Sequence, residues 1–273
     1  PPWRPDVPLT PEDRLTLLEH LDELRKRLFI CLIATVIGVL LAAVFNSFMF
    51  ELLLHPLRAV PNLPESATNI TTFSPAEPFM VSLKVWIVGG VILASPLIIY
   101  ELWAFMAPAF TANEKKYFYP VVLATTVLFF CGLAMAYFVV LPKGLDFLLT
   151  FSAGFFNVQL RAQEYFTFMA LFILAFGVVF ELPVVLVLLA KVGVIDDKFL
   201  KRNRRWAVVA MAFAAAVITP SQDAFSMLAM FLPLYVLYEI SIVIARFVQP
   251  KRDDDVVVED SPSDDDSASH APA

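Results

Sequence analysis

Long uncharged stretches alternate with short charged segments along this chain. The first stretch, residues 28–50, has 23 residues and no Asp, Glu, Lys or Arg. A helix rises about 1.5 Å per residue, so roughly 20 apolar residues cross the hydrocarbon core of a bilayer. The pattern therefore predicts an all-α integral membrane protein with six transmembrane helices, at residues 28–50, 85–100 (extended by apolar neighbours to 79–103), 117–142, 165–190, 206–222 and 224–238.

Two of these spans have unusual features. Residues 206–222 form a helix of only roughly 25 Å, rich in alanines such as Ala210. Small residues let helices approach closely, either within the protein or at a docking face for a partner helix. The span 165–190 contains Glu181, and Pro183 is expected to kink it. An acid inside a membrane is either functional or a hydrogen-bonded structural group.

Flanking charges orient the spans. Sixteen Lys and Arg residues flank them on the side of both termini, and four lie on the opposite side. The positive-inside rule therefore places both termini in the cytoplasm. On the outer side, a segment with five prolines is predicted to be a rigid loop without helix or strand. These prolines are Pro56, Pro61, Pro64, Pro75 and Pro78.

The segment before the first span predicts an amphipathic helix. Thr10 and Pro11 suit its start, and leucines then recur at helical spacing through Leu28. We expect this helix to lie on the cytoplasmic surface before the chain turns into the membrane. Glu23 lies four residues before Arg27, so it either forms a simple helical ion pair or takes part in binding.

Composition narrows the function further. The chain is 59% hydrophobic and 17% charged, against about 45–50% and about 25% in soluble proteins, which excludes a soluble enzyme or a nucleic-acid binder. The net charge of −6 arises from an acidic tail that is expected to be disordered. We predict three regions, namely a cytoplasmic helix at 1–27, a transmembrane domain at 28–245 and the tail at 246–273. Neither a catalytic motif, a cofactor motif nor a metal-ligand cluster is evident, and Cys31 and Cys131 lie in apolar stretches.

Two further acids lie in connecting segments. Glu114 follows Thr111 at the spacing of a capping box, so starting the next helix is one explanation for it. Asp223 lies in a tight outer turn between the last two spans, where an architectural role is common.

Six sequence strings, in order, resemble the TatC family, the multispanning core subunit of the twin-arginine protein translocase. They extend from the first helix to the last span. They read HLDELRKRL (20–28), FSPAEPF (73–79), SPLIIYELWAFMAPAFTANEK (95–115), AYFVVLP (136–142), AFGVVFELPVV (175–185), and TPSQDAFSM with LPLYVLYE (219–239).

This resemblance implies a receptor for signal peptides with two consecutive arginines, which exports folded proteins by the proton-motive force and is not an enzyme. The family's recognition residues map onto Glu23, Arg25, Phe105 and Glu114. Its intramembrane acid maps onto Glu181. The resemblance also implies a concave bundle in the cytoplasmic (inner) membrane, homo-oligomeric within a larger complex.

The same resemblance implies partners and one departure. TatA- and TatB-type single-span proteins would dock on the last two spans, near Asp223, Met227 and Ala210. Some family members carry Gln where this chain has Met227, so a polar contact there must be made differently. A guanidinium can form two parallel bonds to one carboxylate, which fits recognition of arginine by Glu23 and Glu114.

Two alternatives stay open from sequence alone. A secondary transporter would use Glu181 as its proton-coupling acid, although the chain has no evident inverted repeat. A purely structural membrane scaffold would leave the cytoplasmic acids unexplained. A neighbouring gene for a small single-span protein with an amphipathic helix would favour the translocase.

Overall fold

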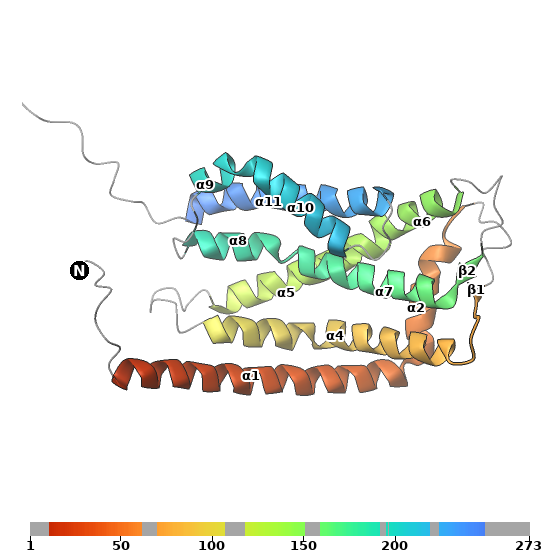
Figure 1. Ribbon diagram of the computed structural model, residues 1–273, viewed down its shortest axis with the longest axis horizontal. Helices are drawn as coiled ribbons and strands as arrows, with labels where there is room; N and C mark the ends of the chain where they lie inside the picture. The colour runs from red at the N-terminus through yellow and green to blue at the C-terminus, as the bar shows by residue number, and fades with distance from the viewer. Residues whose placement is uncertain are drawn as a thin grey trace, which may run out of the picture.

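The computed structural model describes residues 11–61, 70–106, 118–150, 159–191, 195, 197–218 and 224–248. This part of the chain is almost entirely helical (Figure 1). Its helices are α1 (Pro11–Val44), α2 (Asn46–Arg58), α4 (Glu77–Met106), α5 (Phe118–Met135), the π-helix η3 (Ala136–Val140), α6 (Leu141–Thr150), α7 (Ala162–Val179), α8 (Leu182–Lys191), α9 (Asp197–Arg202), α10 (Arg204–Ile218) and α11 (Ala224–Val248). Two short strands, β1 (Ile70–Thr71) and β2 (Leu160–Arg161), pair in parallel, with Ile70 opposite Leu160.

The long helices lie side by side, as expected for a membrane bundle (Figure 1). Helix α1 packs on α4, α4 on α7, α7 on α5, and α8 on α11, which also contacts α10. Within the described residues, five helical segments are long and apolar enough to cross a membrane: α1, α4, the α5–η3–α6 run, the α7–α8 pair and α11. Helix α10 has 15 residues, or roughly 22 Å, so it is even shorter than its sequence suggests.

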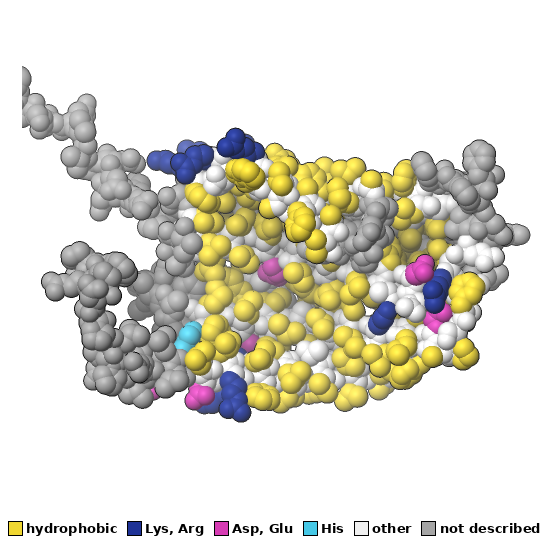
Figure 2. Space-filling model, viewed as in Figure 1, with side chains coloured by type: hydrophobic (Ala, Val, Ile, Leu, Met, Phe, Trp, Pro, Cys, Tyr) yellow, Lys and Arg dark blue, Asp and Glu magenta, His cyan; other side chains and the backbone are white. Residues whose placement is uncertain are grey.

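Helix α1 begins at Pro11 and helix α11 ends at Val248. The start of α1 and the end of α11 lie at the same end of the bundle (Figure 1). We call this the inner end, after the predicted orientation. The opposite end, with β1 and β2, is the outer end. In Figure 2, Lys and Arg side chains gather at both ends, and hydrophobic side chains cover most of the surface between them.

Close backbone approach fixes the contact between α1 and α4. A Cβ atom on Gly90 would lie 2.5 Å from the backbone nitrogen of Val39, and one on Gly38 would meet the carbonyl group of Gly90. Only glycine avoids these collisions, and small residues commonly allow such approach in membrane helices. The two glycines therefore let α1 and α4 lie together along their length.

Several predicted boundaries were wrong. Helix α1 continues without a turn from Pro11 through Leu28 to Val44, so the expected change of direction near residue 28 is absent. The first span also stops short of residue 50, because the helix breaks at Phe45 and α2 runs in another direction (Figure 1). Trp86 Nε1 on α4 donates to Asn46 Oδ1 at 2.8 Å, which gives the start of α2 a polar anchor.

The proline-rich segment was also predicted incorrectly. Pro56 lies inside α2, and residues 70–71 form β1, so this segment contains both helix and strand. The third span is longer than expected, since α5 continues through η3 into α6 and ends at Thr150. Helix α11 likewise extends beyond residue 238, to Val248.

The break in the fourth span confirms the predicted effect of Pro183. Helix α7 ends at Val179 and α8 begins at Leu182, with Phe180 and Glu181 between them. The Glu181 carbonyl accepts bonds from the amides of Val184 (3.0 Å) and Val185 (3.1 Å). Because proline lacks an amide proton, the regular helical ladder cannot continue through this position.

A buried carboxylate joins two connecting segments at the outer end. Glu77, at the start of α4, is 3% exposed and accepts bonds from the Phe73 amide (2.9 Å), the Gln163 amide (3.2 Å) and Arg161 Nε (3.0 Å). Three donors compensate the desolvation of this acid. The contacts hold the start of α4 against the start of α7. We call Phe73, Glu77, Arg161 and Gln163 the outer clamp.

Candidate functional site

An arginine joins two acids at the inner end. Helices α1 and α4 run in opposite directions, so the beginning of α1 meets the end of α4 there (Figure 1). Arg27 donates from Nη2 (2.6 Å) and Nε (3.1 Å) to Glu23 Oε1 on its own helix. It also donates from Nη1 to Glu101 Oε2 on α4, at 2.9 Å. The helical ion pair expected between Glu23 and Arg27 is therefore present, but it is part of a larger cluster.

Exposure differs sharply among these three side chains. The Glu101 side chain is 9% exposed, Arg27 is 24% exposed and Glu23 is 34% exposed. The cluster thus has a buried acid at its base and a more accessible acid at its rim. Arg27 lies between them and contacts both.

Two rings extend the cluster. His20 on α1 stacks against Phe105 on α4, with ring centroids 4.3 Å apart and planes at 14°. His20 Nδ1 also lies 3.8 Å from Glu23 Oε2. We call His20, Glu23, Arg27, Glu101 and Phe105 the Arg27 cluster.

The structure brings together some of the predicted recognition residues. Glu23 and Phe105 both belong to the Arg27 cluster. Arg25 is exposed beside it, with its guanidinium carbon 5.8 Å from the centroid of the Phe29 ring. Glu114 and Asp223 lie outside the described residues.

Sequence reasoning missed Glu101, His20 and the second contact of Arg27. A usable signal was present, because Glu101 lies one helical turn before Phe105 and is an acid at the end of a long apolar stretch. The partner of Glu101 was not accessible from sequence, since Arg27 lies 74 positions earlier in the chain.

Glu181 lies apart from this cluster in sequence and in the fold, at the break between α7 and α8. Its Oε1 atom is buried and has no hydrogen-bond partner among the described residues. The described residues therefore do not give this atom the hydrogen bond that a purely structural acid would need. A functional role for Glu181 inside the membrane stays a prediction.

The other predicted contact residues lie on α10 and α11. Ala210 is exposed on α10, beside the exposed side chains of Val209 and Phe213. Met227 on α11 is half-buried and packs against the core.

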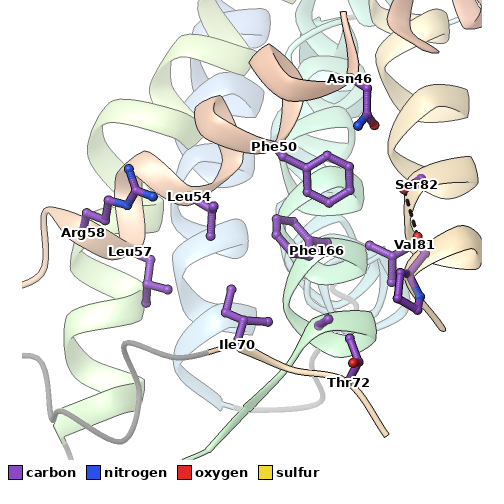
Figure 3. A pocket seen from close by; sticks show the side chains of 12 residues that line it. Asn46, Phe50, Leu54, Leu57, Arg58, Ile70, Thr72, Val81, Ser82 and Phe166 are labelled. Atoms are coloured by element: carbon purple, nitrogen blue, oxygen red, sulfur yellow. Dashed lines mark hydrogen bonds between the residues drawn. The ribbon is translucent and has the colours of Figure 1, made fainter. Parts of the chain in front are cut away.

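A cavity of about 790 Å³ lies at the outer end, between α2, α4 and α7 (Figure 3). Phe50, Leu54, Val81 and Phe166 form its apolar walls, and Arg58 lies at one side. It is far along the bundle from the Arg27 cluster, so it does not coincide with the predicted recognition site.

A second cavity, of about 470 Å³, lies toward the inner end. Side chains from α4, α5, α8 and α11 line it, including Trp103, Phe118, Pro183 and Ile244. Its lining is almost wholly apolar. Trp103 is two residues from Phe105 on α4, so the two side chains point to different faces of this helix, and the cavity lies on another face of α4 than the Arg27 cluster. We call this cavity the inner apolar groove. The described part of the chain contains no group of three or more His, Cys, Asp or Glu residues suited to a metal ion.

Comparisons with known proteins identify the family. Residues 19–233 match the family described as Sec-independent protein translocase protein (TatC). The TatC protein of Carboxydothermus hydrogenoformans is 39% identical over 241 residues, covering 88% of this chain and 97% of that protein. The TatC protein of Escherichia coli K12 is 35% identical over 236 residues, covering 86% and 90%.

A solved structure agrees with the sequence matches. The crystal structure of the twin arginine translocase receptor TatC superposes with a TM-score of 0.74 at 38% identity, covering 84% of this chain and 99% of that one. These matches favour the translocase over the secondary-transporter and scaffold alternatives, and the family is not enzymatic. The chain therefore belongs to the TatC family, as a membrane-integral core subunit of the Sec-independent, twin-arginine protein translocase.

Proposed function

We propose that this TatC chain binds the twin-arginine signal peptides of folded precursors at its inner end, through Glu23, Arg25, Phe105 and Glu114. The observation that carries this proposal is the contact between Arg27 and Glu23. There a guanidinium already directs two nitrogens at a partly exposed carboxylate. A peptide arginine would make the same kind of contact.

The chemistry favours arginine over lysine. A guanidinium presents planar, paired donors that match a carboxylate, whereas an ammonium group is a compact point charge. Glu23 would hold one arginine of the pair and Glu114 the other. Phe105, stacked on His20, offers an aromatic surface against which a guanidinium can also pack.

The inner apolar groove supports the same function. A signal peptide carries an apolar segment after its positively charged region. The groove lined by Trp103, Phe118 and Ile244 lies toward the same end of the bundle, on another face of α4, and has the apolar character that such a segment requires. The charged part of the peptide would therefore bind at the cluster while its apolar part enters the groove.

Membrane placement follows from the charges. The excess of Lys and Arg on the side of both termini supports a cytoplasmic inner end in the inner membrane. We retain the regions 1–27, 28–245 and 246–273 as cytoplasmic helix, membrane domain and cytoplasmic tail. Helix α1 passes through the first of these boundaries without interruption.

We propose that partner proteins bind on α10 and α11. The exposed side chains on α10, together with its small residues, would accept the transmembrane helices of TatA- and TatB-type single-span proteins. Ala210, Met227 and Asp223 mark this surface, and several copies of the chain would assemble in the complex. Glu181, whose Oε1 has no partner among the described residues, would respond to the proton-motive force that drives export.

An export assay in cells tests the receptor function. Glu23→Ala and Glu114→Ala should each abolish export of a twin-arginine precursor while the protein remains inserted in the membrane. Asp22→Asn, which removes an exposed acid beside Glu23, is the matched control and should export normally. Normal export by both alanine variants would disprove the proposed site.

A further inference from the structure

Glu23, the acid predicted to bind a peptide arginine, is already bound by a guanidinium of the same chain. Arg27 uses two of its nitrogens to bind Glu23 Oε1, at 2.6 and 3.1 Å. A peptide arginine that seeks the same oxygen meets a competing guanidinium from the receptor itself. Binding at Glu23 therefore requires that Arg27 release at least part of this contact.

Glu101 makes such a release possible. It is more buried than Arg27 and accepts one bond from Arg27 Nη1 at its Oε2 atom, at 2.9 Å. A guanidinium has five N–H donors in a planar fork, so Arg27 can turn from Glu23 to a two-bond contact with Glu101 and keep a carboxylate partner for its charge. Without Glu101, release from Glu23 would leave Arg27 unpaired in a partly buried position, which is costly.

Charge balance favours the same exchange. The two carboxylates and one guanidinium of the resting cluster sum to a charge of about −1. One peptide guanidinium neutralises this charge and gives each acid an arginine of its own. If Glu101 were neutral, Glu23 and Arg27 would balance each other, and an incoming arginine would add an uncompensated positive charge.

We propose that Arg27 is an internal ligand that occupies Glu23 at rest and moves onto Glu101 when a signal-peptide arginine takes its place. This inference rests on the proposed receptor function. In this arrangement Glu101 is a positioning residue, because it acts through Arg27 and does not itself contact the peptide.

The test is the affinity of a fluorescent twin-arginine signal peptide for the full-length protein in nanodiscs. Glu101→Gln should weaken binding about tenfold, because Arg27 then stays on Glu23. The double variant Glu101→Gln/Arg27→Gln should bind about as well as the unmodified protein, since the competitor is removed together with its second acid. A merely structural role of Glu101 would not give this recovery.

A second variant separates exchange from overall charge. Arg27→Lys keeps the charge but loses the paired donors, so it should compete less well for Glu23 and tighten peptide binding about threefold or more. The matched controls are Asp22→Asn and Lys26→Gln, which change the same charges at exposed positions of the same helix and should leave affinity nearly unchanged.

The outcomes distinguish this inference from the receptor function. Unchanged affinity in Glu101→Gln, or a double variant as weak as Glu101→Gln, would overturn the exchange while leaving the receptor function intact. If the unmodified protein bound Arg-Arg and Lys-Lys peptides equally, the receptor function and the exchange would both be rejected. Thermal unfolding of each variant verifies that the protein is folded when affinity is measured.

Discussion

Arg27 on α1 reaches Glu101 on α4 with a 2.9 Å contact between Nη1 and Oε2, joining positions 74 residues apart. The contact occurs at the inner end, where the start of one long helix meets the end of another. It turns a local ion pair into a bridge between helices.

Loss of the carboxylate at Glu23 should weaken signal-peptide binding. Glu23→Gln keeps the size of the side chain but removes the charge-assisted bonds, so affinity for a twin-arginine peptide should fall about tenfold. Fluorescence anisotropy in nanodiscs measures this change. Glu19→Gln, an exposed acid one turn earlier on α1, serves as the control and should bind normally.

A side chain at Gly90 should separate α1 from α4. Gly90→Ala places a Cβ atom 2.5 Å from the backbone nitrogen of Val39, which cannot move without shifting α1. Overpacking of this kind costs about 2 kcal/mol and should lower the unfolding midpoint in detergent by about 5 °C. Gly144→Ala is the matched control, because its Cβ would make an ordinary 3.4 Å contact with Phe225. Equal unfolding midpoints for the two variants would show that the packing of α1 on α4 does not require this close approach.

The outer clamp should contribute to stability but not to peptide binding. Glu77→Gln removes the carboxylate that pairs with Arg161 and replaces one acceptor oxygen by a donor, so the unfolding midpoint should fall by about 5 °C or more. Peptide affinity should be unchanged, because the clamp lies at the opposite end of the bundle. Glu164→Gln provides the comparison and should leave the midpoint nearly unchanged. Its side chain is 77% exposed, and its Oε1 lies 3.7 Å from Arg161 Nη1. An unchanged unfolding midpoint for Glu77→Gln would show that these contacts do not stabilise the protein.

Partner helices should be found next to α10 and α11. With Cys31 and Cys131 replaced, single cysteines at Ala210 or Met227 should crosslink to a cysteine in the transmembrane helix of a TatA- or TatB-type protein. Met230→Cys is the control, because Met230 is fully buried and should not react. Absence of crosslinks from both test positions in active complexes would place the partners elsewhere.

The sequence predicted the membrane class well because the physical signal is strong. An uncharged stretch as long as residues 28–50 is typical of a transmembrane helix and not of a soluble protein. Pro183, inside another apolar run, interrupts the hydrogen bonds of its helix directly. The expected break near Glu181 is present for this reason. Boundaries were less predictable, because apolar residues such as Phe45 and Phe50 suit either side of a helix break.

The candidate site was only partly predictable. The helical spacing of Glu23 and Arg27 predicts their contact directly, and that contact is present. The contact between Arg27 and Glu101 depends on how α1 crosses α4, which in turn depends on the close approach at Gly38 and Gly90. No spacing along the chain encodes that crossing, so the pairing becomes visible only in the fold.

Equilibrium binding of a signal peptide is the most direct test of the receptor function. A fluorescent twin-arginine peptide, its Lys-Lys counterpart and the Glu114→Ala variant would be compared on the purified protein in nanodiscs. We predict selective binding of the Arg-Arg peptide, with the selectivity lost in Glu114→Ala. Equal binding of both peptides to both proteins would contradict the account, because the affinity would then be only hydrophobic.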